Sequence, residues 1–229
     1  MVANRDVIEN PFYYHLLTRN FIFKGPVTEW YMRIKVKLEH NYHLFNELIP
    51  QEARITDIGC GYGFLSFILS WTGKNRQVTG IDYDEEKIEV ANNCFARKEQ
   101  VHFFATDALS AEMPTSDVFI MNDMLHYMPY EKQERLIEKC MSQLSEDGFI
   151  IIRDGDKGDP KKHEMTKMTE VCSTQIFKFN KTAGELFFSS SDQIKAIAEK
   201  NGYSMRTVSN SHYTSNTIYI LKKEQTTNK

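Results

Sequence analysis

The chemically most informative stretch of the chain is a glycine-rich turn that carries an acidic residue. An apolar run, 53–58, leads into this turn, and an amphipathic run, 64–71, follows it at once. The pattern predicts a buried strand that bends sharply into a helix, with glycine where the backbone needs positive φ or a ligand comes close. Amides at a helix start suit an anion, whereas Asp57 would repel one and favours a ligand with an ammonium or sulfonium group. The glycines stand at alternate positions, Gly59, Gly61 and Gly63.

Acidic residues also follow the next two expected strands. The strand predicted over 77–81 ends in Asp82, about 20 residues after the glycine turn, where a second-strand carboxylate can meet a ribose. Tyr83 beside it could stack on a base. The strand predicted over 101–105 leads into Asp107. Either acid alone would also suit a solvated strand end, but two at this spacing favour a nucleoside-binding edge.

The pattern Asp-x-Gly-x-Gly-x-Gly after a strand resembles the first motif of the class I S-adenosylmethionine-dependent methyltransferases. The resemblance covers residues from about 50 to 222. It implies S-adenosyl-L-methionine as the cofactor and S-adenosyl-L-homocysteine as its product. A dinucleotide fingerprint would instead want a small residue where Phe64 stands, which disfavours a nicotinamide-dependent oxidoreductase. The cofactor contacts expected from the resemblance are Asp57, Gly59, Gly61, Gly63, Asp82, Tyr83, Asp107, Ala108 and Asn122.

A histidine follows the fourth expected strand, 117–121, and is the first candidate for catalysis. The run 125–128 resembles the post-strand-four segment of small-molecule O-methyltransferases, whose histidine removes the proton of the methyl acceptor. Imidazole suits this task because its pKa lies near working pH. His126 is therefore the expected base. The alternative is a histidine that only bonds the backbone of its loop.

The fifth expected strand, 149–153, ends in a second acidic cluster. Asp154 or Asp156 could orient the acceptor or His126, and both are expected catalytic residues; a solvated loop is the alternative. A further option is Mg²⁺ held by Asp123 with one of these acids, since hard cations prefer oxygen ligands. Metal-dependent catechol methyltransferases carry an Asp-Asn pair at this strand end, whereas this chain has Asp-Gly-Asp, so no metal is expected.

Two apolar segments outside the expected sheet point to the acceptor. Residues 1–50 are rich in aromatic side chains and should form two helices, 11–19 and 28–48, as a lid or cap, with plain packing as the alternative. The insertion 157–188 mixes Met and Phe with lysines, and methionine suits adaptable pockets. Both segments favour an aromatic or lipid-like acceptor, although core packing would also explain the insertion. The expected acceptor contacts are Tyr13, Tyr14, Tyr31, Tyr127 and Met165.

The order of elements predicts an α/β fold with a doubly wound, mixed seven-stranded sheet of the Rossmann-like methyltransferase type. A helix over 130–144, a turn over 145–148, and a final antiparallel hairpin of 203–208 and 217–221 complete the prediction. The expected domains are the helical lid 1–50, the S-adenosylmethionine-binding domain 51–222 and a tail, 223–229.

Composition restricts the remaining classes of protein. Hydrophobic residues make up 41% and charged residues 26% of the 229 residues, as in globular proteins, and the net charge of −3 disfavours nucleic-acid binding. Four scattered cysteines and the lack of a long apolar run favour a cytoplasmic protein without a transmembrane segment. The resemblance to methyltransferases of bacterial lipid or pigment pathways implies possible association with lipid-pathway enzymes. A binding module that keeps the cofactor site without catalysis stays an alternative.

Overall fold

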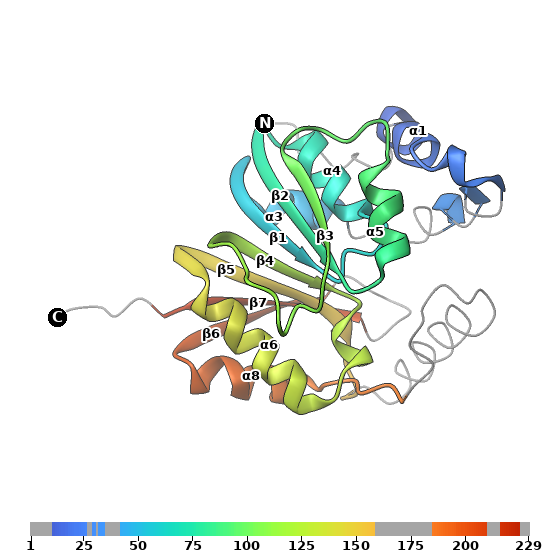
Figure 1. Ribbon diagram of the computed structural model, residues 1–229. Helices are drawn as coiled ribbons and strands as arrows, with labels where there is room; N and C mark the ends of the chain where they lie inside the picture. The colour runs from blue at the N-terminus through green and yellow to red at the C-terminus, as the bar shows by residue number, and fades with distance from the viewer. Residues whose placement is uncertain are drawn as a thin grey trace. The chain divides into compact units, whose positions relative to one another are not determined.

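The computed structural model describes residues 11–26, 29–30, 32–34, 42–158, 185–209 and 216–224. Seven strands in this part of the chain form one mixed sheet in the order β3-β2-β1-β4-β5-β7-β6 (Figure 1). The predicted α/β class and seven-stranded sheet are confirmed. The strands are β1 (Glu52–Ile58), β2 (Asn75–Asp82), β3 (Val101–Ala105), β4 (Ser116–Asn122), β5 (Leu144–Gly155), β6 (Tyr203–Ser209) and β7 (Asn216–Lys223).

Helices alternate with the first strands, as a parallel sheet requires. Strands β1, β2 and β3 pair in parallel, as do β4 and β5, whereas β7 runs antiparallel to β5 and β6. The predicted terminal hairpin is thus confirmed. The helices with defined bounds are α1 (Pro11–Arg19), η1 (Ile22–Lys24), α3 (Tyr42–Leu48), α4 (Phe64–Thr72), α5 (Glu85–Asn92), η2 (Leu125–Tyr127), α6 (Tyr130–Ser142) and α8 (Ser191–Lys200), and residues 26, 29–30 and 32–34 are helical as well.

The chain divides into two compact units between Asp107 and Ala108. In the first unit, α4 packs on β2 and β3 and is covered by α1 and α3, so its residues 64–71 are all buried. Phe67 lies at the centre of this packing, in ring contact with Phe21, Trp71 and Phe103. In the second unit, α6 packs on β5 and α8 packs on β6.

Part of the segment expected to form a lid is fixed to the first unit by a buried arginine. The Arg76 guanidinium donates hydrogen bonds to Asn46 Oδ1 at 2.7 Å, to the Ile49 carbonyl at 2.6 Å and to the Pro50 carbonyl at 2.8 Å. These bonds attach α3 to β2. The predicted helix 11–19 is confirmed as α1, and the second predicted helix ends at Leu48 as expected, but Thr28 and residues 35–41 lie outside the described part of the chain.

The sequence prediction was wrong between the fourth and fifth strands. Helix α6 ends at Ser142, and β5 begins at Leu144, inside the stretch assigned to the helix end and turn. Leu144 pairs with Ser116 across a register shift, and Ser145 Oγ donates to Asp117 Oδ1 at 2.8 Å. Pairing with the start of β4 draws this turn-like sequence into the strand, which local composition could not show.

The last strand and the expected insertion lie as follows relative to the expected domains. Strand β7 continues through Lys223, one residue into the expected tail. Residues 159–184, most of the expected insertion, lie outside the described residues. Among the residues that the structure describes, no helix is long and apolar enough to cross a bilayer.

Gly63 and Gly202 provide a test of how tightly the glycine turn is packed. Both have left-handed backbones, with φ of +78° and +75°, but a Cβ on Gly63 would lie 2.5 Å from Phe103 Cζ, whereas one on Gly202 would meet nothing within 4 Å. Gly202→Ala should therefore cost only backbone strain, about 1–2 kcal/mol of unfolding free energy. Gly63→Ala should cost a further 1–3 kcal/mol or so, because the core is overpacked. Denaturant unfolding of both variants measures the difference; equal losses would contradict the packing seen around Phe103.

Candidate functional site

The glycine turn is held in shape by the end of β2. The amides of Gly59 and Cys60 both donate to the Ile81 carbonyl, at 2.7 and 3.1 Å. The Gly61 amide donates to Asp82 Oδ2 at 2.8 Å. The turn between β1 and α4 therefore takes its conformation from hydrogen bonds to the neighbouring strand, as well as from its glycines.

Asp82 lies at the strand end where the sequence predicted a ribose contact. It is buried, and its other oxygen, Oδ1, accepts from the Asp84 amide at 2.9 Å. A carboxylate has about four acceptor positions, so these two bonds leave room for a ribose hydroxyl. Tyr83, expected to stack on a base, is 53% exposed, and Asp107 is exposed. Ala108 is buried, and its carbonyl accepts from Lys139 Nζ at 3.0 Å.

Asp57 lies in strand β1, paired with Gly80, and not in the turn where the sequence placed it. Its side chain is 2% exposed and accepts a hydrogen bond from Ser66 Oγ at 2.5 Å. Burial raises the pKa of Asp57 to about 7; the Ser66 hydrogen bond opposes this shift, and the charge of Asp82 adds to it. The pKa of the carboxyl thus lies near neutral pH, and an adjacent cationic group would favour its ionised form.

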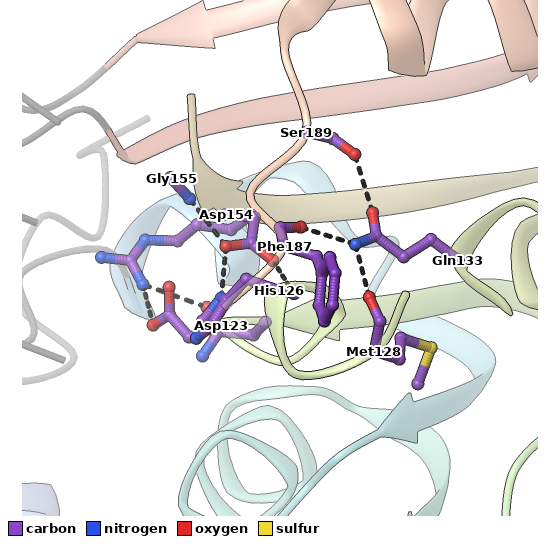
Figure 2. A network of polar contacts seen from close by, with 10 residues as sticks. Asp123, His126, Met128, Gln133, Asp154, Gly155, Phe187 and Ser189 are labelled. Carbon is purple, nitrogen blue, oxygen red and sulfur yellow. Dashed lines mark hydrogen bonds and ion pairs between the residues drawn. The ribbon is translucent and has the colours of Figure 1, made fainter. Parts of the chain in front are cut away.

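The second unit contains a buried histidine–aspartate pair (Figure 2). His126 Nδ1 lies 2.6 Å from Asp154 Oδ1, and the His126 amide donates to Asp154 Oδ2 at 3.1 Å. The Gly155 amide also donates to Oδ1, at 2.7 Å. An ionised carboxylate can only accept, so opposite one Nδ1 would carry the proton and Nε2 of a neutral ring would be the basic nitrogen. The pair has the arrangement of a general base with an orienting acid.

Two aromatic rings contact the His126 imidazole. The Phe188 ring stacks on it with centroids 4.6 Å apart at 16°, and the Tyr127 ring lies at 4.2 Å and 48°. The backbone of the same segment is attached too, because the Phe187 amide donates to the His126 carbonyl at 2.8 Å. These contacts leave His126 1% exposed.

The structure separates the two acids that the sequence left as alternatives. Asp154 contacts His126, whereas Asp156 Oδ1 accepts from the amides of Gly158 at 2.8 Å and Ser191 at 3.3 Å, at the start of α8. Of the two acids, Asp154 is the one placed to orient His126. Asp156 stays a predicted catalytic residue, but one that would orient the acceptor and not His126.

Arg153 forms an ion pair with Asp123, the acid that the magnesium alternative required. Asp123 lies at the end of β4 with φ of +54°. Arg153 Nη1 also lies 3.4 Å from Asn122 Oδ1, a residue expected at the cofactor. The Asp123 charge is thus compensated by a side chain of the neighbouring strand.

Several residues of these two sites were missed by the sequence analysis. Nothing in the local sequence marks Ser66 as the partner of Asp57 or Phe188 as the partner of His126. Gln133 is also among the missed residues, but the sequence could have indicated it, because it is a polar residue within the apolar repeat of α6. Of the expected acceptor contacts, Tyr13 and Tyr14 are half-buried in α1, whereas Tyr31 and Met165 lie outside the described residues.

Comparison with known proteins identifies the class. The methyltransferase domain family matches residues 49–226. Carboxy-S-adenosyl-L-methionine synthase of Campylobacter jejuni is 25% identical over 111 residues, 48% of this chain and 47% of that protein. The chain thus spans about half the length of the curated relatives it matches.

Solved structures share the fold over more of the chain. Magnesium protoporphyrin IX methyltransferase from Synechocystis, with S-adenosylhomocysteine bound, has a TM-score of 0.62 and 20% identity over 96% of this chain and 97% of its own. An O-methyltransferase family 2 protein from Planctomyces limnophilus in complex with apigenin has a TM-score of 0.58 and 16% identity, over 80% of this chain and 56% of its own.

The chain belongs to the methyltransferase domain family. The methyltransferase family predicted from the glycine turn is thereby confirmed. The turn fits the cationic methionine end of this cofactor: Asp57 is a buried acid, and a Cβ on Gly61 would meet nothing within 4 Å, so the backbone is open there.

Asp57 should make the stability of the protein depend on pH. Its folded pKa of about 7 lies above the ordinary value of 3.8, so the folded state binds a proton that the unfolded state releases. Its contribution to stability is therefore present in acid and is lost as pH rises from about 4 through 7. Without cofactor, the wild type should lose on the order of 1 to 3 kcal/mol of unfolding free energy relative to Asp57→Asn between pH 5 and 8.

Cofactor affinity provides a second measurement of the ionisation of Asp57. If the cofactor's cationic end favours ionised Asp57, the affinity of the wild type should rise about tenfold between pH 6 and 8 relative to that of Asp57→Asn. Titration calorimetry at both pH values measures this difference, and the neutral variant controls for titration of the cofactor itself. Parallel pH profiles in the two proteins would show that Asp57 does not respond to the ligand.

Proposed function

We propose that this chain transfers the methyl group of S-adenosylmethionine to an oxygen of a small aromatic or lipid-like acceptor, with His126 as the base. The observation that supports this reaction is the buried His126–Asp154 pair, in which Asp154 accepts from both Nδ1 and the amide of the histidine. Two bonds from one carboxylate set the position of the loop and the tautomer of the ring. A histidine that only bonded the backbone of its loop would not need a hydrogen bond between its ring nitrogen and a buried acid.

The His126 side chain has one role in this mechanism. Bound S-adenosylmethionine supplies a methyl group on a sulfonium, which is already a good leaving group. Nε2 would take the hydroxyl proton of the acceptor as the acceptor's oxygen bonds to the methyl carbon, while the methyl–sulfur bond breaks and S-adenosylhomocysteine leaves. Asp154 then stabilises the protonated ring through Nδ1. The protein otherwise holds the reactants in line and excludes water, and the burial of His126 serves this second purpose.

The cofactor contacts that we propose follow the strand ends of each unit. Asp57 with the glycine turn would hold the methionine end, and Asp82 with Tyr83 the ribose and base. The burial of both acids near one turn supports these roles, since their charges influence each other. We also propose Asp107, Ala108 and Asn122 as contacts of the cofactor.

The acceptor that we propose is aromatic or lipid-like because the rings of Phe188 and Tyr127 surround the base. Magnesium protoporphyrin IX and apigenin, named with two of the structural neighbours, are aromatic molecules. Tyr13 and Tyr14, with Tyr31 and Met165, would contact the acceptor from the N-terminal segment and the insertion. We keep the division into a lid, a cofactor domain and an insertion, and association with lipid-pathway enzymes, as parts of this proposal.

The base assignment is tested by two substitutions. His126→Ala should lower turnover by about 10² to 10⁴ because the acceptor's proton has no recipient, while cofactor affinity stays unchanged. Asp154→Asn should lower turnover about 10²-fold or more, because an amide donor turns the imidazole to the wrong tautomer. His102→Ala, an exposed histidine of β3, is the matched control and should keep full turnover.

The acceptor for these assays is found with labelled donor. Extracts of the native cell are incubated with the protein and methyl-labelled S-adenosylmethionine, and the products are identified by mass spectrometry. Labelled acceptor with S-adenosylhomocysteine supports methyl transfer; a carboxylated donor would instead indicate the reaction named for the Campylobacter relatives. Cofactor binding with no product from any extract would favour a non-catalytic binding module, and undiminished turnover in His126→Ala would reject the base.

A further inference from the structure

A glutamine on the buried face of α6 connects the two segments that enclose His126. The buried positions of α6 repeat with helical spacing, and their members are Gln133, Leu136, Ile137, Cys140 and Met141. Gln133 is the polar member of this stripe and is 1% exposed. Burying an amide in an apolar stripe costs free energy unless all its groups are hydrogen-bonded. The hydrogen bonds of Gln133 therefore indicate why a glutamine occupies this position.

Both ends of the Gln133 amide are hydrogen-bonded (Figure 2). Nε2 donates to the Met128 carbonyl at 2.9 Å and to the Phe187 carbonyl at 2.7 Å. Oε1 accepts from Ser189 Oγ at 2.7 Å. Met128 follows the η2 turn that carries His126, whereas Phe187 and Ser189 flank Phe188. One side chain thus joins the histidine loop to the backbone on either side of the ring that stacks on the histidine.

The Phe188 ring restrains the orientation of the imidazole plane, which the Asp154 hydrogen bond does less well. A hydrogen bond at Nδ1 restrains that nitrogen but tolerates some rotation of the ring about the Cβ–Cγ bond. The Phe188 ring, 4.6 Å away and nearly parallel, limits this rotation. The direction of Nε2 depends on that plane, and a base must lie within hydrogen-bond reach of the proton it takes.

We propose that Gln133 is a positioning residue for His126, which acts by holding Phe188 against the imidazole. This inference rests on the proposed function, since it concerns the same base. Tyr130 helps from the same helix, because its hydroxyl donates to the Phe188 carbonyl at 3.2 Å. Small displacements of a catalytic group lower rates steeply. Losing the Gln133 bonds should therefore lower turnover without weakening cofactor binding.

The test uses a signal of the His126 ring that needs no acceptor. In the full chain with ¹⁵N- and ¹³C-labelled histidine, ring resonances of His126 are assigned by their loss in His126→Ala. Stacking on Phe188 should shift its ring protons upfield of those of the exposed histidines. Gln133→Met, similar in size but unable to bond the two carbonyls, should move these protons toward the exposed values. Gln143→Met, at the end of the same helix, is the matched control and should leave them unchanged.

Kinetics separate positioning from a purely structural role. Gln133→Met should lower kcat about tenfold or more with unchanged cofactor affinity, and Phe188→Leu should do the same while leaving the Gln133 bonds to the backbone in place. Since both act through one contact, the double variant should lose little more than either single variant. Phe188→Leu also keeps the inference testable if Gln133→Met does not fold.

Two results would overturn the positioning role. One is a Gln133→Met protein of lower thermal stability whose His126 resonances and kcat match the wild type. The other is a double variant in which the two losses of kcat multiply in full. The base assignment fails separately: if His126→Ala keeps its turnover, the proposed mechanism is wrong, while the ring resonances still show whether Gln133 fixes the imidazole.

Discussion

A carboxylate that is buried at the end of a strand must accept hydrogen bonds from the backbone around it, because the apolar interior offers no water. This constraint shapes both units of the protein. Asp82 accepts from the amides of Gly61 and Asp84, at 2.8 and 2.9 Å, and thereby fixes the glycine turn. Asp154 accepts from the amide of His126 at 3.1 Å and so fixes the loop after β4. In each case an acid at a strand end sets the conformation of the loop that carries the chemistry.

Asp57 is a third buried acid, and its pKa is raised. The hydroxyl and the backbone of Ser66 both hydrogen-bond to it and lower the pKa, but burial outweighs them and raises it to about 7. The ligand-free protein thus holds an acid whose ionised form is disfavoured, and a cationic ligand would relieve that cost. The turn can in this way discriminate between a positively charged amino-acid end and a phosphate, which would add a second negative charge beside Asp57.

Two different contacts constrain the buried His126 ring. Asp154 Oδ1 lies 2.6 Å from Nδ1, and the Phe188 ring stacks on the imidazole. Gln133 joins the segment containing Phe188 to the loop of His126, so the bonds that we propose to align the ring also hold the segment that covers it.

The sequence by itself determined the order of the elements, the glycine turn, the acid at the end of β2 and His126 after β4. These features follow from local patterns: apolar runs, glycine spacing and the residues at strand ends. It could not decide between Asp154 and Asp156, and it placed Asp57 in the turn instead of the strand. Only the tertiary structure shows that Asp154 contacts His126, that Asp57 lies in β1 and that Gln133 bonds two segments, because each depends on contacts between residues far apart in the chain. Strand pairing, which sets the limits of β1 and the early start of β5, brings such residues together, and no local pattern encodes which partners meet.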